Sequence, residues 1–278
     1  MEIFHPFLLI LAGLLGSLAQ EGGCHVELNG VRGIRIPTGA FHPEPPIFPL
    51  PKVGDGSGPL RVVFLHPPDL ERKVFIFPES SDTSHVVLKA TSQQPLTSFT
   101  ICLRSYTDMT RAHTLFSYAT KTSDNEIVVF KSKTNEYSLY VGTADVIFFF
   151  PEKLVSEPSW EQICMSWESE TGLVEFWLDG QPFPRNGMMK GHVISPEASI
   201  VLGQDQDSFG GGFDINQSFV GELTDVYMWD RVLSGDEMCL VWGNHVPSNP
   251  IINWRSLNYV MRGYTVLKPS LFSNCRAE

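Results

Sequence analysis

From about Asp69 onward, the chain is a succession of short runs rich in β-branched and aromatic residues, separated by turn residues. Such runs are typical of half-buried strands, and little helical pattern lies between them. One run ends at Asp179-Gly180, a strong signal for a tight hairpin turn. The expected strands are Val74–Phe77, Val86–Ala90, Phe99–Tyr106, Thr114–Ala119, Ile127–Phe130, Ser138–Val141, Val146–Phe150, Ile163–Trp167, Leu173–Leu178, Ile200–Leu202 and Phe219–Trp229. This spacing predicts an all-β fold, an antiparallel sandwich or jelly roll rather than a βαβ fold.

A single helix is expected near the end of this series. Ser234 and Glu237 have the spacing of a capping box, in which each side chain accepts a hydrogen bond from a free backbone N–H group of the first turn. The helix continues through Trp242 and ends at Gly243. We expect it to lie on one face of a sheet.

The first 68 residues differ from the rest of the chain. Residues 1–19 resemble a secretory signal, because the apolar run Phe7–Leu15 is too short to span a bilayer and small residues precede Gln20. An N-terminal anchor is the alternative. Residues 20–68 contain nine prolines between Pro37 and Pro68, which predicts a poorly ordered extension or, alternatively, a polyproline-type ligand. The organisation is then a signal at 1–19, an extension at 20–68, one domain at 69–271 and a tail at 272–278.

The charge balance narrows the classes of ligand. The chain has 20 Lys and Arg against 31 Asp and Glu, so its formal net charge is −11. A nucleic-acid binder needs a basic surface that displaces counterions from phosphates, so that class is not expected. An acidic chain is suited to binding cations. No later segment is long and apolar enough to predict a membrane span.

Five cysteines are present, which is an odd number for a secreted protein in an oxidising compartment. Cys102 and Cys164 both lie in expected strands, and adjacent strands would bring them into a disulfide. Cys239 falls in the expected helix, where a cysteine is ordinarily a small buried apolar residue. No Cys-x-x-Cys or Cys-x-His spacing favours zinc.

The segment from Gly203 to Gln217 is the strongest candidate for a functional site. It combines Asp205, Asp207, Asp214 and Gln217 with glycines at 210–212, which let the backbone fold around an ion. Hard cations such as Ca²⁺ bind six to eight oxygens from carboxylates, amides and backbone carbonyls. Asp124-Asn125-Glu126 is a second acidic segment, and the two could converge on one calcium cluster. The spacing excludes an EF-hand, and a solvated acidic turn is the alternative interpretation.

Signals for catalysis are weaker. Asp205 and Asp207 are two residues apart, so on a strand they would share a face, as in some jelly-roll glycosidases. The third acid of that motif is missing. The histidines form no metal-binding motif, and no Gly-x-Ser-x-Gly elbow is present. A laminin-G-like adhesion module remains a further alternative. Asn216-Gln217-Ser218 is the one glycosylation sequon, inside the acidic loop.

Several sequence blocks resemble the short pentraxins over about Asp69 to Leu271. The pentraxin signature His-x-Cys-x-Ser/Thr-Trp-x-Ser/Thr has its counterpart in Gln162 to Ser169, where Gln162 replaces the His and the remaining positions match. The other matching blocks are Val201–Gln204, Gln206–Gly211, Gln217–Glu222 and Met228–Asp230. Residues 20–68 have no counterpart in this family, so they are either an addition from an alternative transcript or a true extension.

The resemblance implies a two-sheet, lectin-like jelly-roll sandwich with one helix on a sheet face. It also implies a cyclic homo-oligomer, usually a pentamer, with two Ca²⁺ ions per protomer and a Cys102–Cys164 disulfide. Asp205 stands where the family usually has Glu, and its shorter side chain has less reach toward the second calcium. The implied calcium ligands are Asp124, Asn125, Asp205, the backbone carbonyl of Gln206, Asp207, Asp214 and Gln217.

The resemblance further implies a ligand pocket beside the calcium ions, formed by Val128, Phe130, Tyr140 and Asp145. Phe130 would pack against choline methyl groups, Tyr140 would narrow the pocket, and Asp145 would face a cationic headgroup. The implied ligands are phosphocholine, phosphoethanolamine or acidic carbohydrate, and complement components are implied as further partners. The expected protein is thus secreted, non-enzymatic and calcium-dependent, a lectin-like recognition protein of innate immunity that binds repetitive surfaces.

Overall fold

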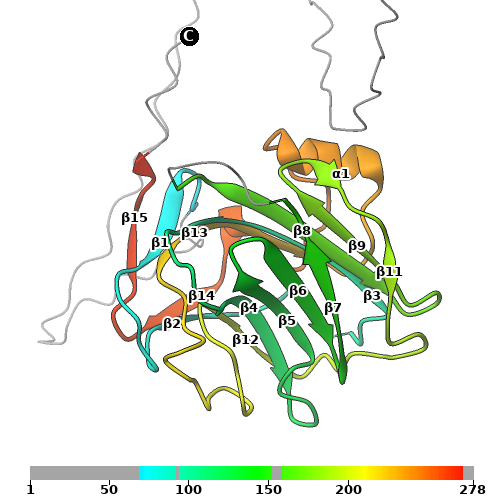
Figure 1. Cartoon of the computed structure of the whole chain (residues 1–278), viewed down its shortest axis with the longest axis horizontal. Coiled ribbons are helices and arrows are strands. Elements are labelled where there is room, and N and C mark those ends of the chain that lie inside the picture. The colour runs from blue at the N-terminus through cyan, green and yellow to red at the C-terminus, as the bar shows by residue number, and fades with distance from the viewer. Residues whose placement is uncertain (1–68, 92–93, 152–157, 272–278) are drawn as a thin grey trace, which may run out of the picture.

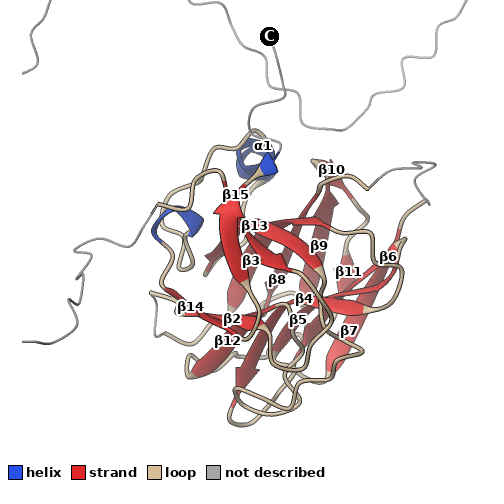
Figure 2. Cartoon of the chain, turned by 90° about the vertical axis from the view of Figure 1, so that its left-hand side faces the viewer, coloured by secondary structure: helices blue, strands red, loops and turns tan. Residues whose placement is uncertain are grey.

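The computed structural model describes residues 69–91, 94–151 and 158–271 as a sandwich of two antiparallel sheets (Figure 1). The expected signal at 1–19, the proline-rich extension at 20–68 and the tail at 272–278 lie outside the described residues. Strands are the main regular structure of the described chain, and helix α1 (Gly235–Trp242) lies at one end of the view (Figure 2). The fold class predicted from the strand pattern is confirmed.

The first sheet has eight strands in the order β10-β9-β8-β3-β13-β1-β15, with β11 also paired to β9. Every neighbouring pair in it is antiparallel. We call it sheet A. Its strands are β1 (Lys73–Phe77), β3 (Ser98–Tyr106), β8 (Glu161–Glu168), β9 (Leu173–Leu178), β10 (Gln181–Pro182), β11 (Asn186–Gly187), β13 (Gly221–Trp229) and β15 (Val266–Pro269).

The second sheet, sheet B, has seven strands in the order β14-β2-β12-β4-β5-β6-β7. Strands β4 to β7 follow one another in sequence as a meander, whereas β12 reaches β4 and β2 by long connections. The strands are β2 (His85–Leu88), β4 (His113–Thr120), β5 (Ile127–Lys133), β6 (Glu136–Val141), β7 (Ala144–Phe149), β12 (Ala198–Leu202) and β14 (Tyr259–Arg262). A short 3₁₀ turn (Trp254–Ser256) precedes β14.

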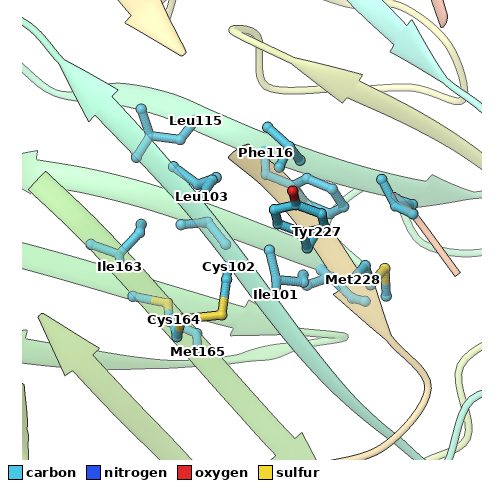
Figure 3. Packing of buried hydrophobic residues seen from close by; sticks show 14 of the residues in the cluster. Ile101, Cys102, Leu103, Leu115, Phe116, Ile163, Cys164, Met165, Tyr227 and Met228 are labelled. Carbon is cyan, nitrogen blue, oxygen red and sulfur yellow. A yellow bond between two sulfur atoms is a disulfide. The ribbon is translucent and has the colours of Figure 1, made fainter. Parts of the chain in front are cut away.

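One continuous apolar core fills the space between the two sheets. Alternate residues along each strand point inward, as the period-two pattern requires. Figure 3 shows part of this cluster, with side chains from β3, β4, β8 and β13. Phe148 of sheet B lies 4.9 Å, between ring centroids, from Phe176 of sheet A, so the sheets interdigitate. This alternation also determines which side chains of β5, β6 and β7 face away from the core.

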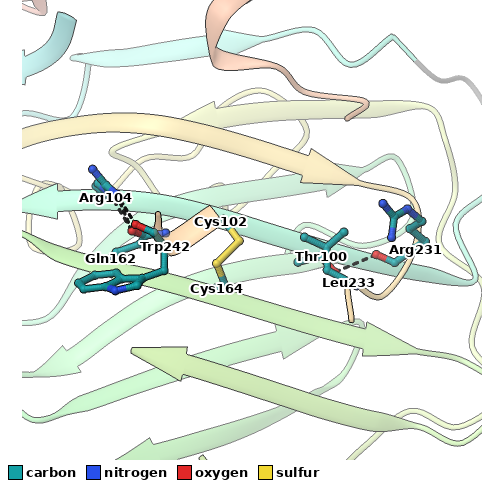
Figure 4. The surroundings of a disulfide bond; sticks show 8 residues. All are labelled: Thr100, Cys102, Arg104, Gln162, Cys164, Arg231, Leu233 and Trp242. Carbon is teal, nitrogen blue, oxygen red and sulfur yellow. Dashed lines mark hydrogen bonds between the residues drawn. A yellow bond between two sulfur atoms is a disulfide. The ribbon is translucent and has the colours of Figure 1, made fainter. Parts of the chain in front are cut away.

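The predicted disulfide between Cys102 and Cys164 is present and joins β3 to β8, where the two residues face each other directly (Figure 4). Hydrogen bonds flank it on both sides: the Arg104 guanidinium donates to Gln162 Oε1, and the Thr100 hydroxyl donates to the Arg231 carbonyl. The bridge closes a sequence separation of 62 residues. In the chain-entropy description, a disulfide that closes a loop of this size stabilises the fold by about 4 kcal/mol, because it restricts the unfolded chain.

Helix α1 begins with the predicted capping box. Glu237 N donates to Ser234 Oγ, and Ser234 N donates to Glu237 Oε2. Glu237 also forms a two-pronged ion pair with Arg231, and these contacts lower the pKa of its carboxyl to about 2. The helix lies against the outer face of sheet A, where Arg104 Nη2 donates to the carbonyl of Trp242.

Cys239 within this helix does not behave as the simple packing residue that the sequence suggested. It is half-buried and disulfide-bonded. The odd number of cysteines could not show this, because the partner of a helical cysteine depends on which segment folds beside the helix.

The Asp179-Gly180 hairpin is confirmed, and both residues have positive φ angles, of 51° and 77°. That combination gives the turn a twist that matches the flanking strands β9 and β10. Gly180 also allows a close approach, since a Cβ atom there would lie about 3.0 Å from the indole of Trp242. Strands β14 and β15 were not expected, because they are short edge strands with exposed residues.

A buried ion pair between the sheets was also missed. Lys131 of β5 points into the core, and its ammonium donates to Glu161 Oε2 of β8 at 2.5 Å. The Tyr137 hydroxyl donates to the same carboxylate oxygen at 2.6 Å. Burial and the negative charge of Glu161 raise the pKa of Tyr137, so its hydroxyl remains a proton donor. Lys131 follows the alternation of inward residues along β5, but a charged side chain is not expected in a core, so nothing in the sequence indicated this pair.

Candidate metal and ligand site

The two acidic segments singled out in the sequence converge at one end of sheet B. The loop 203–217 follows β12, and Asp124-Asn125 lies between β4 and β5. Strand β12 is antiparallel to β4 and ends opposite Phe116, whereas Asp124 and Asn125 follow the far end of β4. The loop after β12 therefore turns back along the sheet, as the contact of Gln206 with Ser199 shows, and brings Asp205 within range of the charge of Asp124. The Gln206 amide fastens the longer loop to the sheet, donating to the carbonyls of Ser117 at 3.2 Å and Ser199 at 3.0 Å. Gln206 Oε1 accepts a hydrogen bond from Gly210 N, which holds the loop closed.

The loop starts and ends beside β4. Gly203 N donates to the Leu115 carbonyl, and Thr114 N donates to the Gln217 carbonyl. Gly203 has a φ of 84°, and a Cβ atom there would lie 2.5 Å from the Phe77 ring, so only glycine fits. Gly212 also has positive φ, and a Cβ atom on it would crowd Asp207 at 3.0 Å. The glycines therefore allow the loop to fold tightly and bring its acidic residues close to one another, as the combination of glycines and acidic residues in the sequence indicated.

Asp205 is the most deeply buried of the four aspartates, with only 7% of its surface exposed. Burial, followed by the charges of Asp207 and Asp124, raises its pKa to about 6. The pKa of Asp207 is raised as well, by burial and by Asp124 and Asp214. No described Lys, Arg or His forms an ion pair with any of these four residues. Negative charge is thus concentrated here without an ion-paired counter-charge, which favours a bound cation.

Three oxygen atoms at the site are buried and have no hydrogen-bond partner: Asn125 Oδ1, Asp205 Oδ1 and Gln217 Oε1. Burying such an acceptor unpaired costs about 1–3 kcal/mol, so a partner outside the protein is indicated. All three are oxygens, the donor type that Ca²⁺ prefers. Within residues 69–91, 94–151 and 158–271, no group of three or more His, Cys, Asp or Glu side chains is assembled tightly enough to hold a metal ion. The donor set mixes amide and carboxylate oxygens, which fits calcium better than zinc or iron.

The four residues expected to form a ligand pocket lie together on the outer face of sheet B. Val128, Tyr140 and Asp145 are opposite one another in three neighbouring strands. Phe130 is one row further along, and its ring lies 6.4 Å from that of Tyr140 in an edge-to-face arrangement. Burial and the charges of Asp145 and Asp205 raise the pKa of Tyr140. Asp205 thus lies close enough to the pocket row for its charge to act on the Tyr140 hydroxyl.

Arg111 is a site residue that sequence reasoning missed. Its guanidinium donates to the Asn216 carbonyl at 2.8 Å, to Ser218 Oγ at 3.2 Å and to Ser80 Oγ at 2.8 Å. These bonds anchor the end of the acidic loop to the body of the sandwich. A lone arginine in an expected loop carried no signal of this role, since its partners are mainly backbone and hydroxyl oxygens far away in sequence.

Asn216 of the glycosylation sequon is exposed, but its amide donates to Asp214 Oδ1 at 2.9 Å. A second hydrogen bond joins Asn216 N to the same oxygen. Asn216 therefore orients one of the expected calcium ligands.

The arrangement does not support the glycosidase alternative. Asp205 and Asp207 lie in a loop after β12, so they do not share a strand face as that alternative requires. Asp205 is buried beneath the loop instead of standing open to a sugar ring.

Comparison with known proteins identifies the family. The model of the Pentaxin family matches residues 73–269. The chain belongs to this family, the pentraxins. It is 47% identical to bovine (Bos taurus) serum amyloid P-component over 205 residues, covering 73% of this chain and 90% of that protein. It is 48% identical to human C-reactive protein over 206 residues, covering 73% and 91% of the two chains.

Among solved structures, the heptameric SAP-like pentraxin of Limulus polyphemus is similar, with a TM-score of 0.67 and 25% identity. The match covers 73% of this chain and 97% of the Limulus chain. The two-sheet pentraxin sandwich with one helix is therefore shown by both sequence and structure. A weaker likeness to the extracellular region of zebrafish Gpr126, at 16% identity and a TM-score of 0.53, concerns the fold alone.

Membership defines the class of activity. The serum pentraxins are non-enzymatic, so this pentraxin is a lectin-like recognition protein of the innate-immune type and not an enzyme. The relationship implies, in general terms, calcium binding and a cyclic homo-oligomer. Within the described ranges, no helix has the length and apolar character needed to cross a bilayer.

Proposed function

We propose that this pentraxin is a secreted protein that binds phosphate-bearing or acidic-sugar ligands on repetitive surfaces in a calcium-dependent manner. The observation that carries the proposal is the set of buried, unpartnered oxygens of Asn125, Asp205 and Gln217 amid carboxylates with raised pKa values. The proposed holders of two Ca²⁺ ions per protomer are Asp124, Asn125, Asp205, the Gln206 carbonyl, Asp207, Asp214 and Gln217. Bound Ca²⁺ would supply the positive charge that attracts an anionic ligand oxygen to an otherwise acidic protein.

The chain's own residues then select the ligand. Phe130 and Tyr140 form a small aromatic corner beside the acidic loop. Asp145, exposed at the start of β7, would face a cationic group such as choline or ethanolamine. Val128 is buried and lies opposite Tyr140 in the neighbouring strand, where it would form the apolar side of the pocket. This combination suits a zwitterionic headgroup whose phosphate is held at the metal site and whose ammonium group is held by Asp145.

Assembly adds strength to weak individual sites. We propose a cyclic homo-oligomer, with a pentamer as the expected ring, that presents the sites on one face. Several sites bound to one repetitive surface raise the overall affinity without new contacts, through effective concentration. Complement components are proposed as further partners, and residues 1–19 as the secretion signal.

Retention on phosphocholine and phosphoethanolamine beads tests the proposal. Binding is expected in calcium, and both EDTA and Asp207→Asn should abolish it. Glu170→Gln is the matched control, because Glu170 is an exposed acid on a turn, and it should bind as the unaltered protein does. Equal binding with and without EDTA would refute the proposal and would favour a calcium-independent adhesion module.

A further inference from the structure

The outer face of sheet B carries exposed apolar side chains next to the proposed pocket. Ile147 is 42% exposed and Phe149 is 64% exposed. Both lie on β7, the last strand of the sheet. Phe148 between them points inward and contacts Phe176 of sheet A, so Ile147 and Phe149 point outward. Neither side chain contributes to the core.

Strand register connects these residues to the pocket. Tyr140 and Asp145 lie opposite each other in the pocket row. The next row across the same three strands consists of Phe130 on β5, Ser138 on β6 and Ile147 on β7. Figure 1 shows β5, β6 and β7 side by side in this region. Phe149 lies two residues beyond Ile147. The four residue steps from Asp145 to Phe149 span about 13 Å of strand. We call Phe130, Ile147 and Phe149 the outer strip.

The outer strip is apolar along its length and is bounded by charge at both ends. Asp145 and the acidic loop lie at one end, and the Lys133–Glu136 ion pair lies at the other, opposite Phe149. Ser138, which lies between Phe130 and Ile147 in the register, hydrogen-bonds to Ser132 at 2.9 Å, so both hydroxyls are satisfied without a ligand. A polar chain, such as a second sugar residue, would find few hydrogen-bonding partners here.

Size argues against a protein as the occupant. The exposed parts of Ile147 and Phe149 amount to on the order of 200 Å². A stable protein–protein interface needs roughly 800 Å² on each partner. The strip is too small for that, but the distance of about 13 Å along β7 from Asp145, at the pocket, to Phe149, at the far end of the strip, matches a hydrocarbon chain of roughly ten carbons.

We propose that the outer strip binds the hydrocarbon chain of an alkyl phosphate ester whose phosphate group lies at the calcium site. The proposal rests on the calcium-dependent phosphate binding proposed above, and it names the ligand class as amphipathic phosphate esters. The phosphate would be held at the loop end of the strip. The chain would run along β7, between Phe130 and the exposed faces of Ile147 and Phe149.

The test is calorimetric titration of the whole protein in calcium with n-alkyl phosphates from ethyl to octyl, below their micelle concentrations. Complete burial of a methylene raises affinity about fourfold, and an open strip that covers one side should give about twofold for each methylene. The double variant Ile147→Ser/Phe149→Ser should bind ethyl phosphate normally but lose the dependence on chain length. Leu240→Ser removes an equally exposed apolar side chain (45%) on α1 and is the control.

The outcomes separate the two proposals. Binding of ethyl phosphate without any gain for octyl phosphate overturns the outer strip and leaves the proposed function intact. Failure of ethyl phosphate to bind in calcium overturns the proposed function. If the chain-length dependence survives in the double variant, the chain binds elsewhere and the strip is refuted. A change of oligomeric state in the double variant, measured by gel filtration, would instead identify the strip as a contact between copies. Equal melting temperatures of the variants in calcium verify folding.

Discussion

Replacing Asp205 by Asn should have opposite effects on stability with and without calcium. Asp205 is a buried carboxylate next to Asp207 and Asp124, and these surroundings raise its pKa from an ordinary 3.8 to about 6. The folded form therefore holds the Asp205 proton more tightly than the unfolded chain does. Stability falls as the pH rises through the window from about 3.8 to about 6, because folding must then accommodate the charged carboxylate.

The magnitude follows from the size of this shift. About two pKa units correspond to about 3 kcal/mol of stability, which is present at pH 4 and lost at pH 7.5 in the absence of metal. The amide of the Asp205→Asn variant carries no charge, so in EDTA at pH 7.5 we expect its free energy of unfolding to rise by up to about 3 kcal/mol. Calcium at about 100 times its dissociation constant stabilises the unaltered protein by about 2.7 kcal/mol. The variant should lose most of that gain, because the proposed carboxylate ligand has been replaced by a weaker amide.

Urea unfolding followed by tryptophan fluorescence measures all four conditions: each protein in EDTA and in calcium. The variant should be the more stable protein in EDTA at pH 7.5 and the less stable in calcium. As the pH is lowered from 7.5 to 4 in EDTA, the variant should lose its greater stability relative to the unaltered protein. Glu170→Gln, at an exposed position, should change the free energy of unfolding by no more than about 0.5 kcal/mol, in EDTA or in calcium. An Asp205→Asn protein that is destabilised equally in EDTA and in calcium would refute the reasoning, because the carboxylate would then be a structural acceptor.

Three further predictions concern stability, each measured by urea unfolding. Replacing Cys102 and Cys164 together by Ala should cost about 4 kcal/mol, and a loss below about 1 kcal/mol would contradict the loop-entropy account. Glu161→Leu should cost roughly 3–5 kcal/mol, because it leaves the Lys131 ammonium buried without its partner. Adding Lys131→Leu should recover most of that loss, and a fully additive double variant would show that the pair is not coupled. Ser234→Ala should cost about 1 kcal/mol through loss of the helix cap, with Ser234→Thr as the conservative control.

Most of the strands were predictable because their signals are local. The alternation of β-branched and aromatic residues in Phe99–Tyr106 shows which side chains face the core without reference to any partner. The turn at Asp179-Gly180 and the capping box at Ser234 are equally local, since each depends on residues within four positions. Strand β14 was missed for the converse reason: as an edge strand with exposed residues it lacks the alternation.

The candidate site was predictable in composition but not in geometry. The acidic and glycine-rich character of residues 203–217 indicated a cation. Whether Asp124 and Asn125 lie near that loop depends on β12 pairing with β4, which is a contact between residues some 80 positions apart. Arg111 could not be predicted at all, because its partners are Asn216 and two serines from distant segments.

The sequence by itself determined the strand pattern, the helix cap, the excess of negative charge and the family, because these depend on residue type and short spacing. Only the tertiary structure decided which carboxylates lie close to one another, why Lys131 is buried, and that Phe130 and Ile147 lie in one row beside the pocket. Each of these depends on the pairing of strands distant in sequence. The free energy of such pairing comes from the whole core, so no single segment of the sequence specifies it.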